Sequence, residues 1–439
     1  FSCNQLNLKT MKVEEKEKAL LIGVSTKNQM DFQESMDELK NLAEACEMFV
    51  AGVMEQNLKA IHPAHYIGSG KVEEVRLLLA ETNARVLIFN NDLSPSQLNN
   101  LEKELDCRVL DRTTLILEIF SERARTREAK LQVEVAKLQY LLPRLIGTGE
   151  NLGRQSGGVG TKNRGSGEKK LELDKRKIEI KIAELNLELE SLTKERETQR
   201  KKRKKTEVPS IALVGYTNSG KSTLMNAMVE TYKKPESKKV FEKDMLFATL
   251  ETSTRNIILP NHKMFFLSDT VGFVSNLPHD LVKAFRTTLE EVREANLLLH
   301  VIDYSNPNYK KQMQVTIETL NEIGAGHIPV INVYNKSELT TVTLPSIKEN
   351  EAFISAKNRI GINELVGMIE KHVFKLYIEC IMLIPYNEGN IVSYLNENAN
   401  VQSVEHRSDG TLLYLQCKES DFKRLNQYIQ SNKDLPLAS

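Results

Sequence analysis

The segment GYTNSGKST follows the apolar run IALV and has the spacing Gly215-x-x-x-x-Gly220-Lys221-Ser222. Glycines let backbone N–H groups wrap around a phosphate, and the N-terminus of a following helix adds positive potential. In this spacing the lysine reaches the β- and γ-phosphates, and the serine hydroxyl binds Mg²⁺. We therefore predict a loop that binds the phosphates of a nucleotide. Its residues are Gly215, Tyr216, Thr217, Asn218, Ser219, Gly220, Lys221, Ser222 and Thr223.

A second apolar run, MFFLSD, ends at Asp269, which we expect to hold the magnesium shell. Three residues later a glycine lets the backbone approach the γ-phosphate. The residues that follow Asp269 are Thr270, Val271 and Gly272. Between the phosphate loop and this run, LFATLETSTR offers Thr249 as the second Mg²⁺ hydroxyl, with Thr252 and Thr254 as alternatives. The other residues that we expect there at the nucleotide are Phe247, Ala248, Leu250 and Glu251.

Two later apolar strands, IPVINVY and FIS, lead into side chains that can read a base. A carboxylate accepts the N1–H and N2–H of guanine, which adenine does not offer, and lysines stack on the ring faces. Glu338 stands where Asp is usual; its extra methylene keeps the charge, so we expect guanine preference to persist. This ordered set predicts a GTPase. Its residues are Asn335, Lys336, Ser337, Glu338, Ser355, Ala356 and Lys357.

We assign no catalytic side chain from the sequence. Ras-like enzymes place a Gln directly after the Asp-x-x-Gly segment to orient the attacking water. This chain has Phe273 at that position. A phenyl ring can neither donate nor accept, so we predict slow intrinsic hydrolysis unless a partner or an ion supplies the missing group. The alternative role of Phe273 is core packing.

Positive charge is concentrated in the middle of the chain. The chain of 439 residues has a net charge of +1, but residues 111–205 alone carry 24 basic and 15 acidic side chains. A chain of this length has room for about three domains of ~150 residues. We predict an N-terminal α/β domain, a helical hairpin, a P-loop GTPase domain and a small α+β domain. Their ranges are 11–112, 113–205, 206–375 and 376–439.

In the N-terminal segment, short β-like runs alternate with amphipathic helical ones, which predicts a mostly parallel sheet. KALLIGVST and VLIFN are typical of strands, and SMDELKNLAEACEM and SPSQLNNLEKEL are typical of helices, the latter capped by Ser94 or Ser96. The stretch HYIGSGKVEEV resembles an incomplete phosphate loop. We interpret it as a turn that opens a helix.

The middle segment has leucine and isoleucine seams before and after a glycine-rich loop, which predicts an antiparallel pair of helices. Helices of this length extend roughly 40–50 Å; the alternative is that each seam packs on a globular body. The loop, 143–167, holds eight of the chain's 21 glycines. A run of eight basic residues, 194–205, is either a solvated linker or a nucleic-acid contact. The RNA-contact candidates are Arg144, Arg154, Lys162, Arg164, Lys169 and Lys170.

The remaining features are those of a reduced, cytosolic protein. Five scattered cysteines lack metal-ligand spacing. No apolar run approaches the ~18 residues of a membrane span, so we expect a cytoplasmic chain. The C-terminal segment predicts strands over CIMLIPY and TLLYLQC and helices over GNIVSYLNENA and ESDFKRLNQYI.

The chain resembles the HflX family of ribosome-associated GTPases from about Lys12 to the C-terminal segment. The resemblance rests on GYTNSGKST, LFATLETSTR, DTVGF, NKSE and SAK, and on the more family-specific GRQSGGVGTKNRGSGEKKLELDKR. The family usually has Pro where Ser166 stands and Asp where Glu338 stands. Asn218 also resembles the phosphate-loop Asn of potassium-activated GTPases, which implies K⁺ beside Mg²⁺.

This resemblance implies a monomeric GTPase that binds GTP and GDP and the large ribosomal subunit. It also implies that the protein dissociates stalled ribosomes during stress, with the hairpin loop reaching ribosomal RNA near the peptidyl-transferase region. Some relatives displace ribosome-targeting antibiotics, so ribosome protection in antibiotic resistance is an alternative. A nucleotide-dependent RNA-remodelling factor is another, and a signalling switch whose hairpin binds a protein is a third.

Overall fold

The computed structural model describes seven stretches of the chain: residues 16–26, 32–154, 164–204, 208–232, 253–274, 290–374 and 377–430. For residues 145–154, 164–171 and 195–204 the description is limited to the backbone. The chain divides into two compact units, one made of Phe1–Glu122 and Val133–Asn186 and the other of Arg123–Gln132 and Leu187–Ser439. None of the helices among these residues is long and apolar enough to cross a membrane.

The first unit contains a parallel four-stranded sheet, as the alternating pattern predicts. Its strand order is β2-β1-β3-β4. The strands are β1 (Lys18–Thr26), β2 (Phe49–Leu58), β3 (Val86–Phe89) and β4 (Arg108–Asp111). The helices are α1 (Phe32–Ala45), α2 (Ser69–Thr82), α3 (Pro95–Leu105) and α4 (Arg112–Arg123). The stretch HYIGSGKVEEV does open a helix, and Ser94 rather than Ser96 caps α3.

The sheet is covered on both faces. Leu20, Ile22 and Val24 of β1 pack in one cluster with side chains of α2 and α3. The residues between them point the other way because side chains alternate along a strand. There a Cβ on Gly23 would meet Met36 Sδ of α1 at 2.3 Å, so the glycine lets α1 lie close to the sheet.

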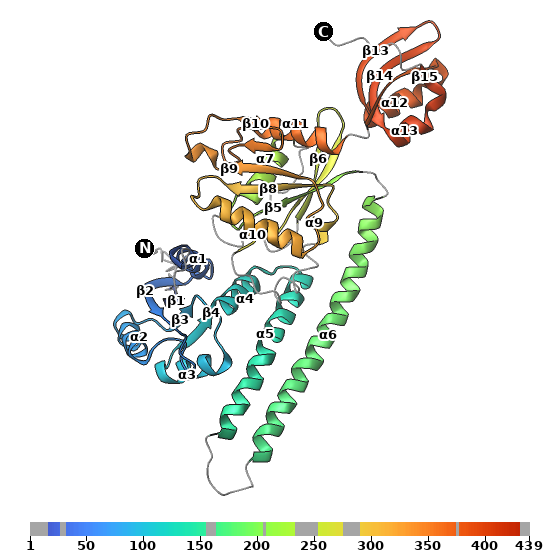
Figure 1. Ribbon diagram of the computed structural model, residues 1–439. Helices are drawn as coiled ribbons and strands as arrows, with labels where there is room; N and C mark the ends of the chain where they lie inside the picture. Colours follow the sequence, from blue (N-terminus) through green and yellow to red (C-terminus); the bar gives the residue numbers. More distant parts are fainter. Residues whose placement is uncertain are drawn as a thin grey trace, which may run out of the picture. The chain divides into compact units, whose positions relative to one another are not determined.

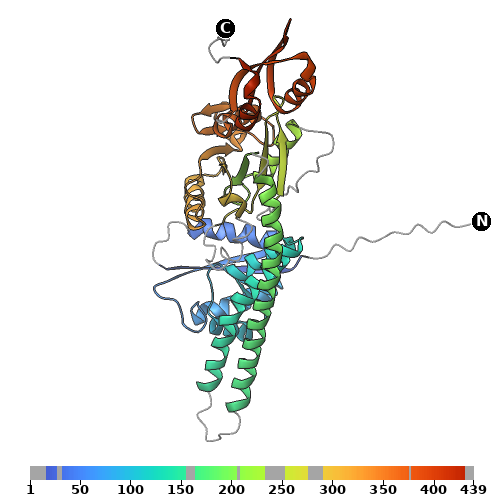
Figure 2. The same cartoon turned by 90° about the vertical axis from the view of Figure 1, so that its right-hand side faces the viewer.

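The hairpin consists of α5 (Arg127–Arg154) and α6 (Arg164–Lys204), which run antiparallel and side by side in both views (Figures 1 and 2). Seam residues are covered: Leu131, Val135 and Leu185 are buried, whereas Leu173 and Ile180 on other faces of α6 are exposed. The helices also extend into the segment for which we predict a loop. Residues 143–154 and 164–167 are helical, with Pro143 inside α5.

In the second unit, the segment predicted to be a GTPase domain contains a seven-stranded sheet of order β10-β11-β9-β8-β5-β7-β6. Its pairs are parallel except β6 with β7 and β10 with β11. The strands are β5 (Ser210–Val214), β6 (Ser253–Ile258), β7 (Met264–Asp269), β8 (Leu297–Asp303), β9 (Val330–Asn335), β10 (Ser346–Lys348) and β11 (Glu351–Phe353). The helices are α7 (Lys221–Thr231), α9 (Glu290–Arg293), α10 (Tyr309–Glu322) and α11 (Ile362–Val373), with a 3-10 turn η1 (Ser337–Leu339).

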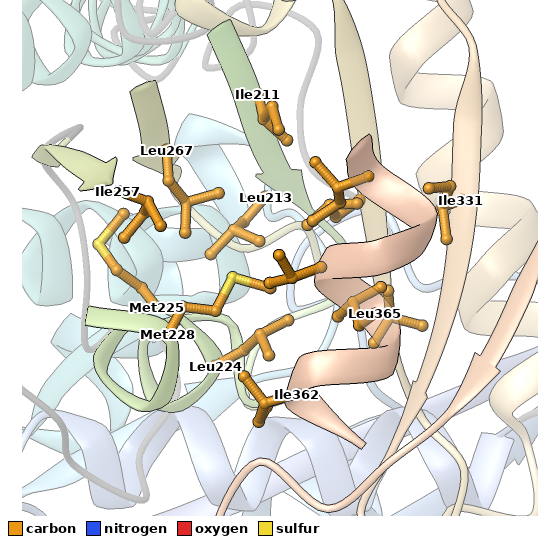
Figure 3. Packing of buried hydrophobic residues seen from close by; sticks show 14 of the residues in the cluster. Ile211, Leu213, Leu224, Met225, Met228, Ile257, Leu267, Ile331, Ile362 and Leu365 are labelled. Carbon is orange, nitrogen blue, oxygen red and sulfur yellow. The ribbon is translucent and has the colours of Figure 1, made fainter. Parts of the chain in front are cut away.

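A single apolar cluster fixes α7 and α11 on this sheet (Figure 3). Ile211 and Leu213 of β5 face Leu224 and Met228 of α7, and all four side chains are fully buried. The apolar run before the glycine loop and the helix after it therefore share one core. This packing holds the two ends of the loop in place.

The C-terminal part is an antiparallel sheet of order β13-β14-β12-β15, as expected for a small α+β domain. Its strands are β12 (Tyr377–Ile384), β13 (Asn400–Arg407), β14 (Gly410–Lys418) and β15 (Ile429–Gln430). The helical elements are η2 (Tyr386–Glu388), α12 (Gly389–Asn398), α13 (Glu419–Arg424) and η3 (Asn426–Tyr428). The helix expected over 419–429 is shorter because Ile429 pairs with Met382 of β12.

Candidate nucleotide site

The glycine loop connects the end of β5 to the start of α7 and needs two of its glycines for their backbone. Gly215 has φ +145 and Gly220 has φ +95, conformations that side chains rarely adopt. A Cβ on Gly220 would lie 2.2 Å from Asn335 Nδ2, and one on Gly215 would lie 2.2 Å from Val301 O. The loop is therefore both curved and tightly surrounded.

Lys221 lies inside the curve of the loop. Its Nζ donates to the carbonyl oxygens of Tyr216 at 2.8 Å and Gly215 at 3.1 Å. Burial lowers the pKa of Lys221 to about 8, although the carboxylate of Asp269 favours the charged form. Gly272 lies close by, since a Cβ there would be 2.8 Å from this Nζ. The ammonium group is thus held where the loop and the Asp-x-x-Gly segment meet.

Two further hydroxyl groups of the loop have no hydrogen-bond partner among the described residues. Thr217 Oγ1 and Ser219 Oγ are both buried, and neither makes a hydrogen bond within the described stretches. Leaving a buried hydroxyl unbonded costs about 1–3 kcal/mol, so such atoms are expected where a ligand supplies the partner. Asn218 between them is exposed and has φ 59.

The metal-ligand candidate Ser222 is paired with the carboxylate predicted to stand behind it. Ser222 Oγ donates to Asp269 Oδ2 at 2.6 Å, and Asp269 is completely buried at the end of β7. Next to it, Thr270 Oγ1 donates to Leu213 O at 2.6 Å, which fixes the start of the following segment. The second candidate, Thr249, and its neighbours Phe247, Ala248, Leu250 and Glu251 lie outside the described residues.

Phe273 connects the Asp-x-x-Gly segment to the phosphate loop through its backbone. Its N–H donates to Gly215 O at 3.1 Å, and its carbonyl accepts from Thr217 N–H at 2.8 Å. The side chain is only 3% exposed. The phenyl ring is therefore packed in the interior, in keeping with the core-packing role, and the backbone bonds hold the two phosphate-facing segments together.

The predicted base-reading residues lie together although they come from two separate loops. Asn335 Nδ2 donates to Ser219 O at 2.9 Å, and its Oδ1 accepts from Ala356 N at 2.9 Å. The N–H of Ser337 donates to Ile354 O at 3.2 Å. Asn335 thus joins both base loops to the phosphate loop.

Glu338 lies in the turn η1, three residues after Asn335. Its Oε2 is buried and has no hydrogen-bond partner among the described residues. Lys336 has φ 58, and Lys357 is exposed at the end of the second base loop. A carboxylate oxygen, an asparagine amide and two lysine side chains are the donors and acceptors expected around a guanine. The fold brings these residues together, and their contact with a guanine stays a prediction.

The residues also fit a magnesium ion held by a nucleotide. No group of three or more His, Cys, Asp or Glu side chains in the described ranges could hold a metal alone. A hydroxyl beside a buried carboxylate, as at Ser222 and Asp269, suits Mg²⁺ that takes most of its ligands from phosphate and water. Ser222 would hold the ion, and Asp269 would orient the ligands around it.

Comparisons with known proteins identify the family of the chain. Residues 33–121 match the family model described as GTP-binding GTPase N-terminal, and residues 123–203 match the GTP-binding GTPase middle region. Residues 210–336 match the 50S ribosome-binding GTPase model. The GTPase HflX of Caldanaerobacter subterraneus subsp. tengcongensis is 42% identical over 417 residues, which cover 95% of each chain. The chain belongs to the GTPase HflX family.

Two further comparisons extend the range of relatives. The GTPase HflX of Escherichia coli (strain K12) is 37% identical over 416 residues, which cover 93% of this chain and 95% of that one. A crystal structure of a GTP-binding protein from Sulfolobus solfataricus in complex with GDP is 25% identical, with a TM-score of 0.44. It covers 82% of this chain and 99% of that chain. Membership of the HflX family makes the protein a GTPase within the 50S ribosome-binding GTPases.

Two residues near the site were missed by the sequence reasoning. Asp303, the last residue of β8, accepts from Lys336 Nζ at 2.8 Å and from Ser305 Oγ at 2.6 Å. His300 on the same strand is 2% exposed, and burial lowers its pKa to about 4. Both belong to LLLHVID, and a polar residue inside so apolar a run was the available signal.

The RNA-contact candidates divide into two groups. Arg144 points back to the N-terminal sheet, where its Nη2 donates to Asp111 Oδ2 at 2.6 Å. The side chains of Arg154, Arg164, Lys169 and Lys170, and the whole of Lys162, lie outside the described part. We therefore remove Arg144 from the candidates, because an arginine held by a buried carboxylate is not available to a phosphate.

Proposed function

We propose that this GTPase binds the large ribosomal subunit and dissociates stalled or stressed ribosomes, with the tip of the α5–α6 hairpin reaching ribosomal RNA near the peptidyl-transferase region. The hairpin is the single observation that carries the proposal. Two helices of 28 and 41 residues place a glycine-rich, basic sequence at their distal end. Such a stem gives reach, and glycines let the backbone approach irregular RNA closely.

The electrostatics of the hairpin segment support an RNA partner. The net charge of +9 in residues 111–205 contrasts with a whole-chain value of +1. Basic side chains that neutralise phosphates release counterions, which makes the affinity depend steeply on salt. The remaining candidates for these contacts are Arg154, Lys162, Arg164, Lys169 and Lys170.

In this proposal the nucleotide occupies the site described above. Residues 215–223 and 269–272 surround the phosphates, and residues 335–338 and 355–357 surround the guanine. Lys221 contacts the phosphates, because its ammonium exchanges two backbone carbonyls for a stronger charge-assisted partner. When bound, Mg²⁺ supplies charge neutralisation at the phosphates; Ser222 and Thr249 are its proposed protein ligands.

Sedimentation of intact ribosomes on a gradient, with GTP or GDP, tests the function. We expect the parent protein to separate the subunits with GTP and to bind the large subunit. A variant with Arg154, Lys162 and Arg164 changed to Ala should keep GTP affinity but lose splitting. Its ribosome affinity should depend less on salt, by roughly one unit of slope for each phosphate that the variant no longer neutralises.

Two controls separate charge from position and nucleotide from RNA. Changing Arg176, Lys177 and Lys181 of α6 to Ala removes the same charge from exposed positions on the stem and should cost less splitting. Lys221→Ala should bind ribosomes poorly in response to GTP.

A tip variant that splits ribosomes as well as the parent would contradict the role of the tip. ATP-driven unwinding of RNA would favour RNA remodelling, and a partner that survives ribonuclease would favour a signalling switch.

A further inference from the structure

A buried carboxylate connects the N-terminal sheet to the hairpin stem. Asp111 is the last residue of β4 and is completely buried. Its Oδ2 accepts from Tyr140 Oη and from Arg144 Nη2, each at 2.6 Å. Its Oδ1 accepts from the hydroxyl and the N–H of Thr114 in the first turn of α4. We call Asp111, Tyr140 and Arg144 the Asp111 clamp.

Arg144 is the cation that balances this buried charge. Its side chain is only 15% exposed, and its Nη2 also donates to Leu93 O at 3.2 Å. The guanidinium carbon lies 3.3 Å from the centroid of the Tyr140 ring. Burial raises the pKa of Tyr140 and the Asp111 charge raises it further, so the phenol stays a donor. Removing Arg144 would leave a buried carboxylate without its cation, which is strongly unfavourable.

The clamp acts where the helix itself is weakest. Tyr140 and Arg144 lie on either side of Pro143, which has no N–H and interrupts the backbone hydrogen bonds of α5. Sharp kinks in helices are found at such residues. A helix secured on both sides of a proline to one carboxylate of the sheet has a defined direction at that point.

The direction of α5 at Pro143 determines where the far end of this helix lies. Beyond it, α5 continues to Arg154, a further length of about 17 Å. A change of angle at the proline is therefore carried outward to Arg154, the last residue of α5. The clamp and the sheet belong to the same compact unit as residues 133–186 of the hairpin.

We propose that Asp111, Tyr140 and Arg144 are positioning residues that fix the direction of the distal hairpin relative to the N-terminal sheet. The consequence for ribosomes rests on the proposed function, because only a tip that acts on RNA needs a fixed direction. The geometric part does not rest on it. Arg144 thus serves the tip from within the protein instead of contacting RNA.

The geometric test is a distance measurement on the free, full-length protein. Spin labels attached through unnatural amino acids replace Leu77 of α2 and Leu173 of α6, which are 66% and 57% exposed. The labelled parent should give a single narrow distance distribution. Arg144→Ala should broaden and shift it, and Tyr140→Phe should do so less, because it keeps the ring and loses one hydrogen bond. Arg144→Lys should restore part of the parent distribution.

A matched control and a second readout separate positioning from stability. Arg127, like Tyr140 and Arg144, belongs to α5, and it forms an exposed ion pair with Glu188 of α6. Arg127→Ala removes this ion pair and should leave the distance distribution unchanged. Melting temperatures are measured on the same samples. If Arg144→Ala does not fold, Tyr140→Phe and Arg144→Lys decide the outcome. A parent-like distribution in the folded variants, even with a lowered melting temperature, would overturn the proposal.

The ribosome-splitting assay then distinguishes the two proposals. Clamp variants should lose splitting while their affinity for GDP is unchanged. If the tip-charge variant loses splitting and the clamp variants do not, the clamp has no role in splitting and the functional part of this inference is wrong. If neither set affects splitting, the proposed role of the tip fails, and the distance distribution alone decides the geometric claim.

Discussion

Ser222 Oγ donates to Asp269 Oδ2 at 2.6 Å, across 47 positions of sequence. Ser222 lies in the first turn of α7, directly after the phosphate loop, and Asp269 is the last residue of β7. Their contact exists because β5 and β7 are parallel neighbours, with Leu213 paired to Asp269. The proton of the Ser222 hydroxyl is thereby directed towards the Asp269 carboxylate.

This relationship predicts how Asp269→Asn will affect magnesium. An amide at this position keeps the shape but loses the charge and one of the two acceptor oxygens. Replacing such a second-layer group typically costs about 10–100-fold in metal affinity. We expect the Mg²⁺ concentration that half-maximally enhances GDP binding to rise by that factor. Titration of fluorescent GDP with Mg²⁺ measures it.

The neighbouring Ser268→Ala variant is the control. Its hydroxyl bonds with Thr254 Oγ1 at 2.9 Å on the other side of the strand. Its Mg²⁺ dependence should match that of the parent. Equal Mg²⁺ dependence in Asp269→Asn and the parent would show that the carboxylate does not act on the ion.

Glu338 provides a prediction about base selection. Its Oε2 is buried without a partner in the described part of the chain, as a group that reads a base edge would be before binding. Glu338→Asp should keep or sharpen the preference for GDP over ADP, since it restores the commoner geometry. Glu338→Gln should weaken GDP binding and leave ADP binding weak. Competition against fluorescent GDP gives the ratio of affinities.

The matched control is Glu349→Gln, an exposed glutamate elsewhere in the same domain. It removes the same charge and should leave the ratio unchanged. Loss of guanine preference in Glu338→Asp would show that Glu338 does not read the base.

The local sequence was sufficient to predict the phosphate loop but not the hydrogen bonds that connect it to distant residues. The strand, the glycine turn and the helix are contiguous, and the pattern of their apolar residues predicts how the strand and the helix pack. The bond from Asn335 to Ser219 spans 116 positions and depends on the order of the strands. Neither Asn335 nor Ser219 carries a sign of that pairing in its own neighbourhood.

The same limit explains the misassignment of Arg144. Composition placed it in a basic, glycine-rich segment, and composition is averaged over residues that the fold separates. Its partner Asp111 lies 33 positions earlier. Strand β2 was also missed: four of its ten residues are exposed and Gly52 interrupts its apolar pattern, so tertiary pairing with β1 decides its conformation.

His300 predicts a pH dependence of stability for the GTPase domain. Burial lowers its pKa to about 4, whereas an unfolded histidine titrates near 6.5. Between these values the unfolded state binds more protons, so this group destabilises the fold as pH falls from 6.5 towards 4. The loss reaches about 3 kcal/mol once both forms are protonated.

We expect His300→Gln, which cannot titrate, to lose less stability than the parent between pH 7 and pH 5. Urea unfolding at both values measures the difference, and the transition that GDP shifts to higher urea belongs to this domain. His262→Gln, at an exposed turn, is the control and should behave as the parent does. Parallel losses in His300→Gln and the parent would contradict the assignment.

Phe273 leads to the last prediction, on how hydrolysis is activated. Its ring is buried and its backbone bonds to Gly215 and Thr217, so nothing polar at this position can orient the attacking water. We expect slow phosphate release from the protein alone and faster release with large ribosomal subunits. Phe273→Gln should not restore a fast intrinsic rate, because the side chain at this position points into the interior.

Asn218 stands exposed in the phosphate loop with φ 59, where a side-chain oxygen can meet a monovalent ion. Potassium should therefore support more turnover than sodium in the parent, and the difference should disappear in Asn218→Gly, which tolerates that φ without strain. Phosphate release at saturating GTP, measured in both salts with and without large subunits, decides both points. Equal rates with and without subunits would contradict the partner requirement, and equal rates in the two salts would contradict the role of Asn218.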